Sequence, residues 1–163
     1  MIPAVVVLSF VLDNVFSNFV SIHGLFMPLF TLMALIIIYP YFNQDAKNYL
    51  LTCFFTGLAY DLIYTDTVII HAFLFLIIGY LIMKLNLIFS NNYLNVSIMA
   101  VICIIVYRII YYILLLMTAN LKWSGLLLLK SIYSSLILNI IYILLAFLIT
   151  DRLSFKFKIK KAD

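Results

Sequence analysis

The sequence predicts an all-α membrane protein with six transmembrane helices. The first observation is composition: hydrophobic residues make up 67% and charged residues 10% of the 163 residues, whereas an ordinary soluble domain is ~45–50% apolar. The second is that the apolar residues form six long runs separated by short polar segments. Because one span needs ~20 apolar residues, little of the chain remains for other structure. We therefore expect no soluble catalytic domain.

The six runs define the expected spans of a single domain over residues 1–150. The sequence before the first run has no basic segment and no cleavage pattern of small residues, so we expect this run to be kept as a span. The expected spans are residues 3–21, 25–42, 48–64, 68–83, 96–118 and 126–149, followed by a basic cytoplasmic tail at 151–163.

Three expectations concern particular spans. The second span is the least polar, so we expect it to face lipid, with Pro28 in its first turn, where a missing backbone N–H costs least. A short turn separates the third and fourth spans, which predicts an antiparallel hairpin. The polar residues at 84–95 predict the clearest loop of the chain.

Three ionisable side chains lie well inside the apolar runs: Asp13, Asp61 and Arg108. A charge at membrane depth costs roughly 2.5–3.5 kcal/mol, so such residues usually pair with one another or face the bundle interior. At ~1.5 Å per residue, Arg108 lies about 3 Å in depth from Asp13 and about 10 Å from Asp61. Asp13 is the better partner by depth, whereas Asp61 requires the arginine to extend outward, and the sequence leaves both pairings open.

Polar and small residues recur at helical spacing in three runs. Residues three or four apart share one helix face, and a polar face inside a membrane points to the bundle interior or to another protein. Asp13, Ser17 and Ser21, with Asn14 and Asn18 beside them, form such a stripe in the first run. The third run carries Gly57, a small residue that lets the backbone of a neighbouring helix approach. The candidates for helix packing or partner binding are Asp13, Gly57, Tyr60, Asp61, Tyr64, Arg108 and Asn139.

The motifs of common enzymes are missing from the sequence. It contains no phosphate-binding GxxxxGK[ST], no HExxH, no paired cysteine motif and no nucleophile elbow. We therefore expect no enzyme activity, no cofactor and no metal site. Cys53 and Cys103 lie in apolar runs and are expected to be buried thiols. His23 and His71 lie near span ends rather than in series with the aspartates, which favours helix pairing over a proton path.

Basic residues are concentrated at the end of the chain. The sequence has ten Lys and Arg against six Asp and no Glu, and five of the cations follow Thr150. Placing both termini inside gives the cytoplasm Lys47, Lys84 and these five cations, and leaves Lys122 and Lys130 outside, so an N-in, C-in orientation is favoured. We expect the tail to contact anionic lipid headgroups. Nothing else in the chain supports binding of nucleic acid.

The stretch Thr-Gly-Leu-Ala-Tyr-Asp-Leu-Ile-Tyr-Thr at residues 56–65, with the apolar run that follows it, resembles the MreD family of rod shape-determining proteins in its Gram-positive form. Many relatives have a glycine soon after this stretch, where this chain has Val68-Ile69-Ile70-His71. The resemblance implies a non-catalytic subunit of the cell-elongation machinery in the bacterial cell membrane. It also implies binding to the single-span protein MreC and, through it or directly, to the peptidoglycan polymerase and transpeptidase. In this role the chain would couple wall synthesis to MreB filaments.

The MreD family is similar in fold to the six-helix substrate-binding components of energy-coupling-factor vitamin transporters, although likeness of fold does not assign a ligand. The alternative function is therefore a substrate-binding transporter subunit. Such a subunit needs a small-residue coupling face on the first helix, typically Ala-x-x-x-Ala. Here Ala4 is followed by Val5, Val6, Val7 and Leu8, which favours the scaffold function.

Overall fold

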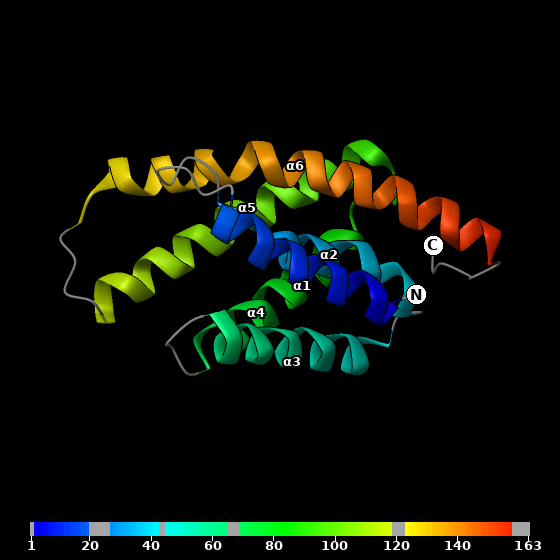
Figure 1. The fold of residues 1–163 in the computed structure, drawn as a ribbon, viewed down its shortest axis with the longest axis horizontal. Helices are drawn as coiled ribbons and strands as arrows, with labels where there is room; N and C mark the ends of the chain where they lie inside the picture. The colour runs from blue at the N-terminus through cyan, green and yellow to red at the C-terminus, as the bar shows by residue number, and fades with distance from the viewer. Residues whose placement is uncertain (1, 20–26, 43–44, 65–68, 119–122, 158–163) are drawn as a thin grey trace.

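The computed structural model describes residues 2–19, 27–42, 45–64, 69–118 and 123–157 (Figure 1). The segments between the expected spans at residues 22–24, with His23, and at 65–67 lie outside these residues, as do most of the segment at 119–125 and the last three lysines of the tail. Within the described residues the chain is helical and contains no strand, which confirms the all-α class. The elements are α1 (Ile2–Phe19), α2 (Phe30–Ile38), the 3-10 helix η2 (Tyr39–Phe42), α3 (Ala46–Tyr64), α4 (Ile70–Asn86), α5 (Tyr93–Thr118) and α6 (Gly125–Lys156).

The last three α-helices are longer than the expected spans. α4 continues to Asn86 and α5 begins at Tyr93, so the loop between them is shorter than the polar stretch at 84–95. α6 continues to Lys156, although its span was expected to end at 149. No glycine or proline follows Ile149 to end the helix, so it extends into the basic tail.

α2 lies in the centre of the bundle, which corrects the expectation that this span faces lipid. Every residue of α2 is buried, and the helix contacts α1, α4, α5 and α6. Figure 1 shows it behind α1 and beside α6. A helix that is apolar all round is suited to burial on every side. In this bundle the helix without a polar face lies in the core and not at the lipid surface.

α2 also begins five residues later than expected, so Pro28 precedes the helix instead of lying in its first turn. The segment before it is bonded to α6. The Met27 N–H donates to the Ser134 carbonyl oxygen at 3.3 Å, and the Leu29 N–H donates to Asn139 Oδ1 at 2.7 Å. These tertiary hydrogen bonds hold the segment outside the helix.

α3 and α4 form the expected antiparallel hairpin, with a glycine on each helix at the contact. A Cβ added to Gly57 would collide with the His71 carbonyl oxygen and lie 2.7 Å from Ala72 Cα. A Cβ added to Gly79 would lie 2.6 Å from Cys53 Sγ. Small residues let membrane helices approach this closely, and the register of these contacts requires the two helices to run in opposite directions.

Within the part of the chain that the structure describes, two helices, α5 and α6, are long and apolar enough to cross a membrane by length and composition. Shorter apolar helices lie at Ile2–Ser17, Phe30–Phe42 and Ile70–Asn86. Large apolar side chains are exposed along α1 and α6, among them Val7, Val11 and Leu145. Such surfaces are suited to contact with lipid.

The close approach at Gly57 makes a stability prediction. Gly57→Ala should lower the free energy of unfolding by ~1–3 kcal/mol or more, because the added methyl group meets the backbone of α4, which cannot rotate away. The measurement is the thermal unfolding midpoint of the purified protein in detergent. Gly125→Ala is the matched control, since nothing lies within 4 Å of its added Cβ. An unchanged midpoint for Gly57→Ala would contradict the close contact.

Candidate functional site

Asp13 binds the first turn of α2 from a neighbouring helix. Its carboxylate accepts hydrogen bonds from the Phe30 N–H at 2.6 Å and the Thr31 N–H at 2.7 Å, and a third from the Thr31 hydroxyl. The first N–H groups of a helix have no partner within that helix, and a negative charge is favourable at this end of the helix dipole. Asp13 therefore caps α2, and only 1% of its surface is exposed.

Asn139 of α6 holds the same region from the opposite side. Its Oδ1 accepts from the Leu29 N–H at 2.7 Å, and its Nδ2 donates to the carbonyl oxygens of Met27 at 3.1 Å and Ser135 at 2.6 Å. We refer to Asp13, Asn139 and residues 27–31 as the α2 clamp. The clamp joins α1, α2 and α6 through direct, buried hydrogen bonds.

Asp61 repeats the arrangement in the α3–α4 hairpin. Its carboxylate accepts from the His71 N–H at 3.1 Å and the Ala72 N–H at 3.0 Å, and it lies 2.8 Å from His71 Nδ1. Because a carboxylate only accepts hydrogen bonds, His71 Nδ1 carries a proton in this contact. Each aspartate thus lies on one helix and caps the helix that follows it in the chain.

Tyr60 and Tyr64 connect the hairpin to α1. The Tyr64 hydroxyl donates to the Phe10 carbonyl oxygen at 2.6 Å, and the Tyr64 ring lies 4.5 Å from the Phe10 ring between centroids. The Tyr60 ring lies 5.0 Å from that of His71. Aromatic contacts continue from His71 to Tyr107 and Tyr111 on α5. These rings join four helices, α1, α3, α4 and α5, around the Asp61 cap.

Arg108 is bonded to a serine rather than to an aspartate. Its Nε donates to Ser135 Oγ at 2.8 Å, and the guanidinium carbon lies 5.8 Å from the centre of the Tyr107 ring. Among the described residues neither Asp13 nor Asp61 forms an ion pair with Arg108, and Asp61 Oδ1 lies 2.8 Å from His71 Nδ1 instead. Backbone N–H groups at helix N-termini compete with Arg108 for the two carboxylates. The depths of the charged side chains along their helices do not include these groups.

Sequence reasoning missed that both aspartates act as helix caps, although the sequence carries a signal for it. The N-cap positions of α2 and α4 are Leu29 and Ile69, and neither makes a side-chain capping bond. Helices usually begin with Ser, Thr, Asp or Asn at this position. A buried helix start without such a residue needs a polar partner from elsewhere in the chain.

Ile69 has a backbone conformation that its side chain disfavours. Its φ of 74° lies in the left-handed region, which costs roughly 1–2 kcal/mol for a residue with a Cβ. The strain is tolerated because the turn must bring the first amides of α4 to Asp61.

No group of three His, Cys, Asp or Glu side chains that could hold a metal ion occurs among the described residues. Cys53 and Cys103 are buried and unpaired with each other, as expected. The polar groups of the site are engaged by backbone and neighbouring side chains, so their arrangement is suited to fixing helix positions.

Removal of the Asp13 carboxylate should destabilise the protein more than removal of a surface cap. Asp13→Ala leaves two amides and a hydroxyl without partners in a buried place, and each costs ~1–3 kcal/mol. Asp45 accepts from the Asn48 N–H at 3.2 Å at the exposed start of α3, so Asp45→Ala should cost only ~0.5–2 kcal/mol. Thermal unfolding in detergent compares the two variants. Equal shifts would show that the buried cap has no special role.

Ile69→Gly should stabilise the protein by about 1 kcal/mol, because glycine adopts the left-handed conformation without the steric cost of a Cβ. Ile77→Gly is the matched control, since Ile77 is similarly exposed but lies inside α4, where glycine costs ~0.5–1 kcal/mol. The same unfolding assay should show shifts of opposite sign. A lower midpoint for Ile69→Gly would refute the strain.

The family of the chain is shown by comparison with known families. Residues 1–155 match the family model of the rod shape-determining protein MreD. Comparisons with curated proteins and with solved structures gave no significant match. MreD proteins are membrane-located structural components of cell shape and not a known enzyme family. Because the match covers essentially the whole chain, this protein belongs to the MreD family of rod shape-determining membrane proteins.

Proposed function

We propose that this protein is a non-catalytic scaffold subunit of the cell-elongation machinery and that it binds MreC within the membrane. Through MreC or directly, it contacts the peptidoglycan polymerase and transpeptidase and couples them to MreB filaments. Membership of the MreD family supports this role. The site geometry agrees with it, because the buried polar groups of α1, α3 and α6 are used to position helices.

We further propose that all six α-helices cross the membrane with both termini in the cytoplasm. The first residues of α1 and the last residues of α6 lie at the same end of the bundle (Figure 1), as an even number of spans requires. α1, α3 and α4 have 18, 19 and 17 residues, close to the ~20 needed for one span. The six-helix layout is also compatible with the expected likeness to energy-coupling-factor components.

Partner binding is supported by the polar residues of α1, which lie partly inside the bundle and partly on its surface. Asp13 faces inward and is buried, whereas Asn14 and Ser17 are exposed on the surface of the chain. Polar side chains are costly against lipid and form hydrogen bonds between membrane helices. A partner helix that covers this part of α1 would remove that cost. We therefore propose the exposed face of α1 around Asn14 and Ser17 as the contact with MreC.

The other candidate residues act in this proposal through helix packing. Gly57 and Asp61 hold α3 and α4 together, and Tyr60 and Tyr64 hold the hairpin against α1. Arg108 and Asn139 are buried and contact Ser135 or residues 27–29. Their substitution alters partner binding by changing the shape of the bundle, and so it also changes stability.

This difference gives a test. Asn14→Leu combined with Ser17→Leu should lower the amount of MreC that co-purifies with a tagged chain by about sevenfold, from two interhelical hydrogen bonds of ~0.6 kcal/mol each. The unfolding midpoint should fall less than it does in Asp61→Ala, because Asn14 and Ser17 are exposed whereas Asp61 is buried. Asp61→Ala should lower both the midpoint and the recovery of MreC.

Thr118→Leu serves as a control, because Thr118 is exposed at the end of α5. Wild-type recovery of MreC with both the double variant and Asp61→Ala would refute the proposed contact and the scaffold role. Recovery of ATPase subunits in place of MreC would indicate a transporter component instead.

A further inference from the structure

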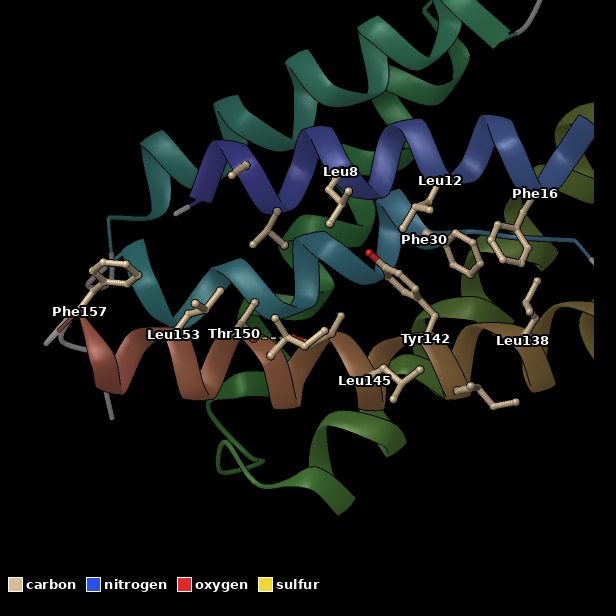
Figure 2. Close-up of a pocket in the computed structure, with 15 residues that line it drawn as sticks. Leu8, Leu12, Phe16, Phe30, Leu138, Tyr142, Leu145, Thr150, Leu153 and Phe157 are labelled. Carbon is tan, nitrogen blue, oxygen red and sulfur yellow. Dashed lines mark hydrogen bonds between the residues drawn. The ribbon is translucent and has the colours of Figure 1, made fainter.

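An apolar groove runs between α1 and α6 on one face of the bundle (Figure 2). Its volume is about 770 Å³, and it extends from Ala4 to Phe16 along α1 and from Leu138 to Phe157 along α6. The Phe30 and Tyr142 rings stack in the middle, with their centroids 4.2 Å apart. The Tyr142 hydroxyl shares a hydrogen bond with Ser9, and the Thr150 hydroxyl donates to the Ala146 carbonyl oxygen. The described walls therefore offer an occupant an almost entirely apolar surface.

The length of the groove is close to the thickness of a membrane. At ~1.5 Å per residue, the stretch of α6 that lines it is about 28 Å long, close to the ~30 Å hydrocarbon core of a bilayer. Its apolar walls can therefore contact an acyl chain within the membrane.

Positive charge lies at one end of the groove. Leu153 and Phe157 line that end, and Arg152 and Lys156 are exposed on the same turns of α6. At ~100° per residue, Lys156 lies about 40° from the middle of the lining face, whereas Asp151 lies about 180° from it. The first turn of α1 lies at the same end, with Ala4 on the groove wall.

We propose that the groove is a binding site for an anionic phospholipid. An acyl chain lies between α1 and α6, and the phosphate headgroup lies beside Lys156 and Arg152, where charge-assisted hydrogen bonds are available. Apolar walls along the membrane depth and cations at one end match the two parts of such a lipid. The inference requires a membrane location but not the proposed binding of MreC, so either proposal can fail without the other.

Native mass spectrometry of the purified full-length chain tests this site. The protein is incubated in detergent with phosphatidylglycerol or with phosphatidylcholine of the same chain length. The wild-type chain should retain phosphatidylglycerol in preference, by about fivefold for each cation near the headgroup. Arg152→Gln combined with Lys156→Gln should remove that preference, whereas Lys130→Gln, an exposed cation elsewhere on α6, should leave it unchanged.

A variant that blocks the groove distinguishes lipid bound in the groove from lipid bound elsewhere on the protein surface. Ala4 is exposed and lines the groove, so Ala4→Trp can fill it without displacing the core. This variant should lose retention of both lipids, whereas Val11→Trp, at an exposed site outside the groove, should not. Equal retention of the two lipids by the wild type, or full retention by Ala4→Trp, would overturn the proposal. Loss of a dimer in Ala4→Trp would also overturn it, since the groove would then be a contact between two chains.

Discussion

The structure depends on the need to satisfy backbone N–H groups where two helices begin inside an apolar bundle. In water, solvent can bond to these amides, but the membrane interior offers none. The protein meets the need with carboxylates from neighbouring helices: Asp13 for α2 and Asp61 for α4. Each capping contact also joins two helices. Local hydrogen bonding and helix arrangement are therefore set by the same side chains.

This constraint explains why α2 can occupy the centre. A helix with no polar side chain except Thr31 has nothing of its own with which to cap its start. Asp13 and Asn139 approach that start from α1 and α6, so the helix begins only where both are present. α1 and α6 meet at Ser9 and Tyr142, and the apolar groove lies between Ala4–Phe16 of α1 and Leu138–Phe157 at the end of α6.

Buried charge in this protein serves structure. Asp13 and Asp61 are bonded to backbone amides, and Arg108 is bonded to Ser135 and lies beside an aromatic ring. A proton or ion path needs ionisable groups in series, and these contacts place the described groups at separate helix junctions instead. Rigid junctions are what a shape-determining component requires, because its partners need a fixed surface to bind.

The sequence by itself determined the membrane class, the all-α fold, the hairpin at residues 48–83 and the family, because hydrophobic runs, short turns and the motif around Asp61 are local patterns. It also singled out Asp13, Gly57, Asp61 and Asn139, which lie at contacts between helices in the structure. Only the tertiary structure decided what the aspartates bind. The sequence gives the depth of each charged residue along its helix. It does not show which backbone amides the fold brings near that charge. For the same reason the burial of α2 and the groove beside α6 depended on helix packing, which periodicity within one helix cannot reveal.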